Sequence, residues 1–138
     1  MSPAAGTLVD SSVLLDVFTE DPEWLEWSEA RLTEAVQRGP VVINAVILAE
    51  IAPRFSRIED LRSALPSMAR SEEIPPAAAF LAGHAHLAYR RAGGAREAIL
   101  PDFLIGAHAA VTRRRLLTRD PRRVVTYIPG VTLISPRG

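Results

Sequence analysis

Residues 7–18 read TLVDSSVLLDVF, a short apolar run followed by an aspartate, two serines and a second apolar run. Thr7 to Val9 have the side chains of a buried β-strand, which would end at Asp10. Serines directly before apolar residues with helical spacing are typical of a helix start, so a helix is predicted from Ser11. The stretch therefore predicts a strand that passes into a helix, with an aspartate at the junction.

The same alternation of short strands and helices continues along the chain. Further strands are predicted at 41–43, 116–118 and 131–134, and helices at 22–38, 44–52, within 57–76, at 77–91 and at 102–112. Strands that are apolar throughout are typical of a parallel sheet covered on both faces. The sequence therefore predicts an α/β fold built around a short, mostly parallel sheet. It contains no repeat or linker, so residues 1–138 are expected to form a single domain.

Composition excludes several classes of function. The sixteen basic residues are all arginines, and they balance sixteen acids, so the chain has no overall positive charge to attract nucleic acid. The lack of cysteine excludes thiolate chemistry and Cys-ligated metals, and the lack of lysine excludes P-loop NTPases and Schiff-base enzymes. The beginning of the chain has no signal-peptide pattern, and the longest apolar stretch, 41–52, is shorter than the roughly 20 residues of a membrane span. A cytoplasmic protein without a membrane segment is expected.

Four acids occupy informative positions. Asp10 ends the first strand, Asp120 follows the third, Asp102 lies at a helix start, and Glu50 lies within the apolar run 45–52. Open α/β sheets bind ligands at the carboxyl ends of their strands, so three of these acids map to the edge where a site is expected.

Each acid also has a purely structural interpretation. Asp10 and Asp102 suit helix caps, Asp120 suits a turn before a proline, and Glu50 suits a narrow exposed stripe on its helix. If the four side chains converge instead, they cannot all stay ionised without a cation. Mg²⁺ or Mn²⁺, which prefer oxygen ligands, would be the suitable ion.

Four segments carry these acids in a familiar order. They are VDSS at 9–12, the run 44–50, PDFLIGAHA at 101–109 and LLTRDP at 116–121, with YIPGV at 127–131 near the end. Together they resemble the PIN-domain ribonucleases and, more narrowly, the VapC toxins of bacterial toxin–antitoxin pairs. The resemblance covers essentially the whole chain, and none of the four acids is missing.

The resemblance implies a PIN-like three-layer sandwich and a metal-dependent endoribonuclease that hydrolyses RNA phosphodiester bonds. Asp10, Glu50, Asp102 and Asp120 match the four pocket acids of the family, which bind Mg²⁺ or Mn²⁺. We predict Asp10, Asp102 and Asp120 as metal ligands, and Glu50 as the group that orients or deprotonates the attacking water. The resemblance also implies a VapB-like antitoxin as partner, an RNA substrate and a homodimer. A helix of the antitoxin would fit a groove near the Trp-containing helix and the run 45–51.

Charge is unevenly distributed along the chain. Residues 113–123 contain six arginines and one acid, whereas 10–34 contain eight acids and one arginine. We predict that Arg119, Arg122 and Arg123 bind RNA phosphates, because the planar guanidinium suits phosphate oxygens. The alternative is a solvated helix end, where arginines are also favourable.

Other polar residues are expected to be structural. Asn44 suits a helix cap, and His108 suits a hydrogen-bonded place in the core. Asp16 suits a solvated or arginine-paired position, with a supporting role in the site, implied by the resemblance, as the alternative. Two competing functions need residues that this chain lacks. A receiver domain needs a lysine that is absent here, and a haloacid-dehalogenase-type phosphatase needs an aspartate where this chain has Ser12. A non-catalytic PIN-like binding scaffold stays open as the alternative function.

Overall fold

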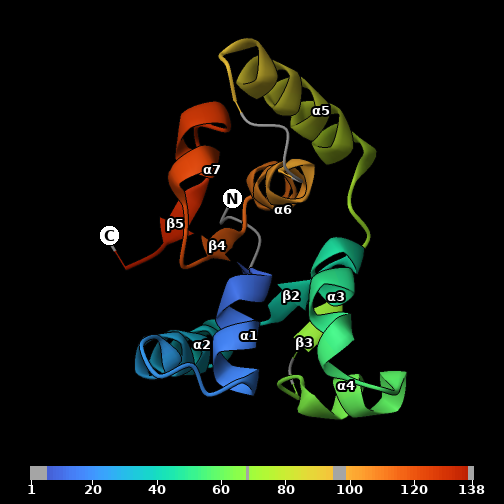
Figure 1. Cartoon of the computed structure of the whole chain (residues 1–138), viewed down its shortest axis with the longest axis vertical. Helices are drawn as coiled ribbons and strands as arrows, with labels where there is room; N and C mark the ends of the chain where they lie inside the picture. Colours follow the sequence, from blue (N-terminus) through green and yellow to red (C-terminus); the bar gives the residue numbers. More distant parts are fainter. Residues whose placement is uncertain (1–5, 68, 95–98, 137–138) are drawn as a thin grey trace.

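A parallel sheet of five short strands runs through the middle of the molecule (Figure 1). The computed structural model describes residues 6–67, 69–94 and 99–136. The strands lie in the order β3-β2-β1-β4-β5, and Leu8 of the central strand pairs with Val42 on one side and Leu116 on the other. Their bounds are β1 (Thr7–Val9), β2 (Val41–Ile43), β3 (Ala69–Ser71), β4 (Arg115–Leu117) and β5 (Thr132–Ile134).

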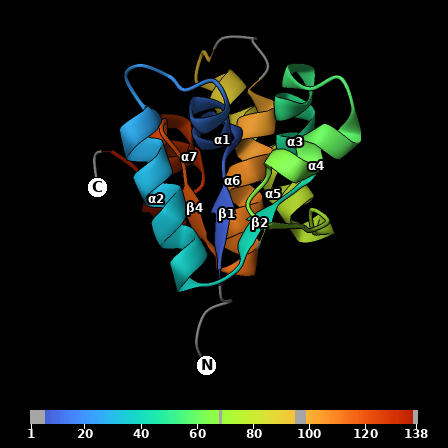
Figure 2. The same ribbon diagram turned by 90° about the horizontal axis from the view of Figure 1, so that it is seen from below.

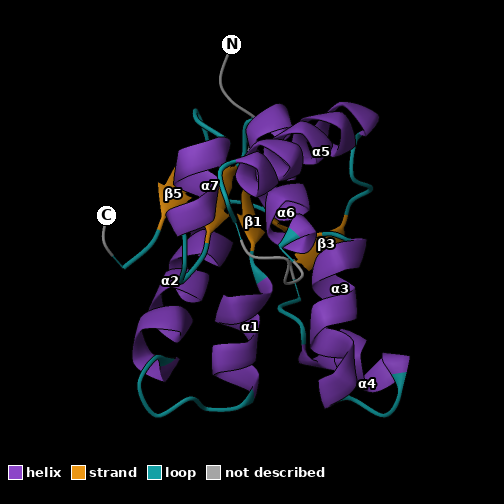
Figure 3. Cartoon of the chain, turned by 45° about the horizontal axis from the view of Figure 1, so that its top comes forward, coloured by secondary structure: helices purple, strands orange, loops and turns teal. Residues whose placement is uncertain are grey.

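Helices cover both faces of this sheet. The helical segments are α1 (Ser11–Phe18), α2 (Leu25–Arg38), α3 (Ala45–Ile51), the 3-10 turn η1 (Ala52–Arg54), α4 (Ile58–Ala64), α5 (Pro76–Arg91), α6 (Leu100–Thr112) and α7 (Arg122–Tyr127). Figure 1 shows α1 to α4 below the sheet and α5 to α7 above it, and Figures 2 and 3 show the same layers from other directions. The predicted α/β three-layer sandwich is therefore confirmed.

The strand order fixes the place where a ligand site is expected. From β1 the chain moves outward through β2 to β3, with its connecting helices on one face. It then crosses back to β4 and on to β5 with helices on the opposite face. The direction reverses between β1 and β4, and the crevice at the carboxyl ends of two such strands is the usual ligand site of open α/β sheets.

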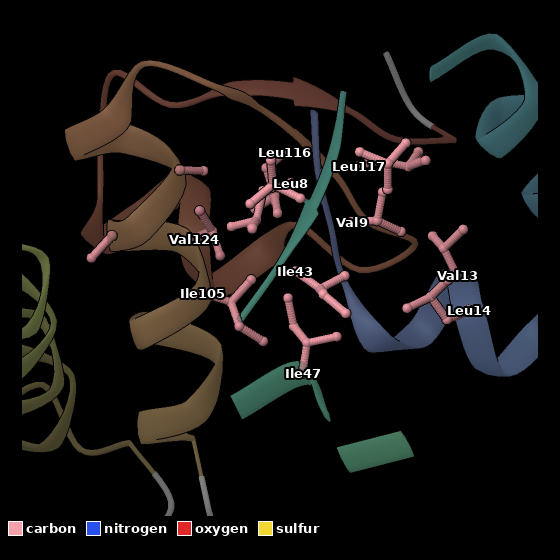
Figure 4. Packing of buried hydrophobic residues seen from close by; sticks show 14 of the residues in the cluster. Leu8, Val9, Val13, Leu14, Ile43, Ile47, Ile105, Leu116, Leu117 and Val124 are labelled. Atoms are coloured by element: carbon pink, nitrogen blue, oxygen red, sulfur yellow. The ribbon is translucent and has the colours of Figure 1, made fainter. Parts of the chain in front are cut away.

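The core explains why most residues of the central strands are apolar. Leu8 and Leu116 face the side of the sheet covered by α6 and α7, whereas Val9 and Leu117 face Val13 of α1 (Figure 4). All five of these side chains are buried. Because both faces are covered, neighbouring strand residues cannot alternate between apolar and polar, as expected for a parallel sheet.

Two elements were not predicted from the sequence, β3 and α7. β3 is an edge strand with exposed Arg70 and Ser71, so it lacks the apolar pattern that marks the other strands. The sequence of α7, RRVVTY, is rich in β-branched residues that favour helices only weakly. Packing compensates, because a Cβ on Gly106 of α6 would lie only 3.0 Å from Val124 of α7. Glycine at this position favours the close approach of the two helices, because any larger residue would push Val124 away.

The start of α2 differs from the prediction. The helix begins at Leu25 rather than at Pro22. Asp21 still serves as a cap, but of the preceding turn: its Oδ1 accepts hydrogen bonds from the backbone N–H groups of Glu23 and Trp24, each at 2.9 Å. The side chain of Asp21 therefore orders the turn that leads into α2.

A buried polar network ties α6 to β2 and β3. His108 is fully buried, and its Nδ1 lies 3.0 Å from Nδ2 of Asn44, whose Oδ1 caps α3 by accepting from the N–H of Ile47. Its Nε2 lies 2.8 Å from Glu72, which also pairs with Arg114. Burial raises the pKa of Glu72, but hydrogen bonds and positive charge from its partners outweigh this and lower it. The structural roles predicted for Asn44 and His108 are confirmed.

In the parts of the chain that the structure describes, no helix is both long enough and apolar enough to cross a membrane.

Candidate active site

A cavity of about 510 Å³ lies at the carboxyl ends of β1 and β4, where the strand order reverses. The start of α1, the start of α6, the loop after β4 and the start of α7 form its walls. Three of the four predicted acids, Asp10, Asp102 and Asp120, line it. Their neighbours in the wall include Ser11, Ser12, Thr118, Arg119 and Arg122. Segments far apart in sequence therefore bring carboxylates and hydroxyls to one place.

Asp10 is held in this cavity by β4, by the residue that follows β4 and by the start of α1. Its backbone N–H donates to the carbonyl oxygen of Leu117 at 2.9 Å, which continues the ladder between β1 and β4. The hydroxyls of Ser12 and Thr118 each donate to its Oδ2 at 2.8 Å. Asp10 occupies the cap position of α1 but makes no side-chain cap bond, so the cap interpretation is wrong. Within the described residues its Oδ1 accepts no hydrogen bond, so it is available to a ligand.

Asp102 lies in the first turn of α6. The helix begins at Leu100, so Asp102 is not its cap, contrary to the structural interpretation considered above. A carboxylate in a first helical turn is favoured by the partial positive charge of the helix terminus. Asp102 lines the cavity on the side opposite α1, because α6 begins there and Asp102 is in its first turn.

Asp120 follows β4 and enters the cavity from the loop before α7. Its N–H donates to the hydroxyl of Thr118 at 3.2 Å, and Thr118 in turn donates to Asp10. Its two carboxylate oxygens pair with Arg122 at 3.1 and 3.3 Å. The Asp120 side chain is 52% exposed and that of Arg122 is 83% exposed, and water and salt screen an ion pair this exposed, so it contributes little to stability. A ligand can therefore displace Arg122 at small cost.

Glu50 does not line the cavity but adjoins it. The hydroxyl of Ser11, which does line the cavity, donates to its Oε1 at 2.7 Å. Burial raises the pKa of Glu50, the bond from Ser11 lowers it, and the negative charge of Asp10 raises it again, with a net increase. Ser11, which contacts Glu50, directly follows Asp10, so Glu50 lies near Asp10. Sequence reasoning missed the role of Ser11, although the paired serines at 11 and 12 were the available signal.

The donor set matches a hard divalent cation. Among the residues that the structure describes, no three or more His, Cys, Asp or Glu side chains are close enough together to hold a metal ion by themselves. Mg²⁺ does not require this, since it is usually held by one or two carboxylates together with water and substrate phosphates. Asp10 offers a carboxylate oxygen, and Asp102 and Asp120 line the same cavity. The residues therefore fit such an ion.

The predicted RNA-binding arginines fall into different environments. Arg122 is exposed and borders the cavity. Arg119 also borders it, but its Nε and Nη2 each donate to Asp16 at 2.9 Å. Asp16 is 2% exposed, so the predicted pairing of Asp16 with an arginine is confirmed and the predicted solvated position is wrong. The side chain of Arg123 lies outside the described part of the structure.

Comparisons with known proteins agree with this architecture. A sequence model of the PIN domain matches residues 7–126. A comparison with curated protein sequences gave no match.

Three solved structures have the same fold along nearly their whole length. VapBC2 from Rickettsia felis bound to a promoter DNA fragment has a TM-score of 0.69 at 17% identity, covering 94% of this chain and 97% of that one. FitAcB from Neisseria gonorrhoeae has a TM-score of 0.70 at 18% identity, with coverages of 95% and 98%. A toxin–antitoxin complex from Klebsiella pneumoniae has a TM-score of 0.63 at 23% identity, also with coverages of 95% and 98%.

At these identities the structural matches show a shared fold, and the sequence match carries the family assignment. That match runs from β1 into α7 and takes in all the segments that border the acidic cavity. The chain therefore belongs to the PIN domain family.

Proposed function

We propose that this chain, as a single PIN domain, is the toxin of a toxin–antitoxin pair and a metal-dependent endoribonuclease. One observation carries the proposal: Asp10, Asp102 and Asp120 line one cavity at the point where the strand order reverses. Structurally similar proteins occur in VapBC complexes and in a complex described as toxin–antitoxin. RNA in the cytoplasm is the proposed substrate.

Asp10 and Asp102 would be the main ligands of Mg²⁺ or Mn²⁺, and Asp120 would support the same or a second ion. A bound divalent ion stabilises negative charge on the reacting phosphate and makes a nearby water more acidic. Asp10 is well prepared for this role, because Ser12 and Thr118 fix one oxygen of its carboxylate and leave the other accessible. Side chains fixed in this way need no rearrangement before binding.

Glu50 would accept the proton of the attacking water or orient that water. A raised pKa makes a carboxylate a stronger base, and the bond from Ser11 fixes its orientation. Arg122 would move from Asp120 to an RNA phosphate as substrate and cation enter. Phosphate binding by Arg119, Arg122 and Arg123 stays a prediction, and the hydrogen bonds of Arg119 to Asp16 make Arg122 the more accessible contact.

The direct test is cleavage of RNA by the purified chain. We expect 5′-phosphate products in the presence of Mn²⁺ or Mg²⁺, and no cleavage when EDTA removes the metal. The substrate should be total cellular RNA with 5′-end mapping, because the sequence does not identify the target. Binding of a partner protein without any metal-dependent cleavage would instead favour the non-catalytic scaffold.

An antitoxin would bind next to the active site. A second cavity of about 830 Å³ lies between α3, α4 and the β2–β3 edge of the sheet, and most of its lining is apolar. It includes part of the run 45–51 that the sequence analysis identified, although neither α2 nor its Trp27 lines it. We propose that an apolar helix of a VapB-like antitoxin occupies it, the helix-in-groove mode of recognition. The homodimer implied by the resemblance also stays a prediction.

Ile58 provides a test of this partner site. It lines the second cavity, yet its side chain is 56% exposed, so Ile58→Glu should leave the fold intact. We expect the variant to lose co-purification with the antitoxin encoded beside it while RNA cleavage is unchanged. The Phe80 side chain of α5 is also exposed, so Phe80→Glu is the matched control and should still bind the partner. Equal retention of the antitoxin by both variants would exclude this cavity as its binding site.

A further inference from the structure

We infer that Asp16 and Arg119 are positioning residues that hold the loop after β4 in the geometry that the active site needs. The inference rests on the proposed function for its effect on metal binding. The contact itself, called the Asp16–Arg119 clamp below, is a property of the metal-free protein.

The clamp is a part-buried ion pair: the Asp16 carboxylate is buried, whereas the Arg119 side chain is 33% exposed. Asp16 lies in α1 with 2% of its surface exposed, and both of its carboxylate oxygens accept from the guanidinium of Arg119 at 2.9 Å. Ser28 of α2, which is also buried, donates a third bond to Oδ2 at 2.7 Å. Burying a carboxylate lowers the stability of the fold unless hydrogen bonds satisfy its oxygens, so the side chain of Arg119 is strongly held.

An aromatic contact completes the fixation. The guanidinium carbon of Arg119 lies 5.3 Å from the ring centroid of Trp24, within the range of a cation–π interaction. The guanidinium is therefore held by Asp16 of α1 and by Trp24 in the turn before α2, and Ser28 of α2 fixes Asp16 in turn. These elements belong to one face of the sheet, whereas Arg119 comes from the loop that leads to α7 on the other.

The backbone of Arg119 lies between the groups that build the site. Its N–H donates to Ser12 Oγ at 3.3 Å, and that same hydroxyl donates to Asp10. The preceding residue, Thr118, donates to Asp10 and accepts from the N–H of Asp120. A shift of this loop would therefore disturb Asp10 through two hydroxyls and would move Asp120 directly.

A positioning role of Arg119 and direct RNA binding by Arg119 predict different effects of substitution. If Arg119 acted mainly as a positive charge for RNA, Arg119→Lys would preserve much of its effect and Asp16 would not matter. If Arg119 acts through the clamp, lysine cannot replace the planar fork that bonds both oxygens of Asp16. Asp16→Asn and Arg119→Lys should then have similar effects on the metal site.

The test combines two measurements on the full chain. In metal-free protein, Asp16→Asn should speed amide hydrogen exchange of Arg119 and Asp120 by about fivefold or more, since their hydrogen bonds depend on the loop position. The amide of Asp10, bonded to Leu117 in the ladder, is the internal control and should change little. Calorimetric titration should show Mn²⁺ affinity about 10–100-fold lower in both Asp16→Asn and Arg119→Lys, as is typical when groups that support metal ligands are removed.

Glu34→Gln is the matched control variant. It removes an exposed ion pair with Arg31 on α2, away from the cavity, and should bind Mn²⁺ like the wild type. Circular dichroism should be used to check that each variant is folded. Unchanged exchange at Arg119 and Asp120, or wild-type Mn²⁺ affinity in folded Arg119→Lys, would overturn the clamp. Failure of the wild type to bind Mn²⁺ would instead overturn the proposed metal site and the clamp's effect on it, while the exchange data would still test the contact itself.

Discussion

Asp10→Asn is expected to lower kcat/KM for metal-dependent RNA cleavage by at least about 100-fold. Removing groups that only support a metal ligand typically costs about 10–100-fold, so loss of a direct ligand should reach or exceed that range. The substitution keeps the shape of the side chain and removes its charge. The carbonyl oxygen of the new amide can still accept the hydrogen bonds from Ser12 and Thr118, so the local structure should be retained. Initial cleavage rates at several Mn²⁺ concentrations give the comparison.

The control for this variant is an acid outside the cavity. Asp60 is exposed on α4, and Asp60→Asn changes the net charge by the same amount. It should cleave RNA at the wild-type rate. Wild-type cleavage by Asp10→Asn at saturating and limiting Mn²⁺ alike would show that this carboxylate is not part of the catalytic machinery.

Phe103→Ala is expected to lower the free energy of unfolding by about 3–5 kcal/mol, the usual cost of deleting a buried aromatic side chain. Phe103 is fully buried, and its ring lies 5.8 Å from the rings of both Tyr89 and Tyr127 in edge-to-face contacts. It therefore joins α6 to α5 and α7. Because Asp102 is the adjacent residue, loosening this turn should also reduce cleavage per folded molecule. Urea unfolding, followed by circular dichroism, measures the stability.

Phe80 is the matched aromatic control. Its side chain is 71% exposed on α5, so Phe80→Ala should change the free energy of unfolding by no more than about 0.5 kcal/mol. Phe103→Leu, which leaves a smaller cavity, should fall between the two variants. A loss below about 1 kcal/mol in Phe103→Ala would mean that the aromatic cluster does not hold α6 in place.

Local sequence patterns predicted most of the fold because most elements carry their own signal. Residues 41–43 are apolar throughout and 7–9 have the β-strand composition Thr-Leu-Val, and residues with turn or cap chemistry follow each of them. β3 has no such pattern because it is a polar edge strand. α7 has none because its stability comes from packing against Gly106, which is distant in sequence.

The site was partly predictable for the same reason. Asp10 and Asp120 follow strands, so a parallel sheet places them at one edge whatever the details of packing. Whether Asp16 is buried or exposed depends on α2 and on the loop after β4, which approach it only in the folded chain. Local sequence could therefore not decide whether Asp16 is solvated or paired with an arginine. It also could not show that the guanidinium of Arg119 bonds Asp16 rather than RNA.

Locating bound Mn²⁺ by anomalous scattering in crystals of the chain tests the central claim most directly. The account predicts an anomalous peak in the cavity within coordination distance, about 2.0–2.2 Å, of Asp10 and at least one of Asp102 and Asp120. Asp10→Asn crystals under the same conditions should lack the peak. Mn²⁺ bound only elsewhere on the molecule, or a cavity without a peak at millimolar Mn²⁺, would contradict the account.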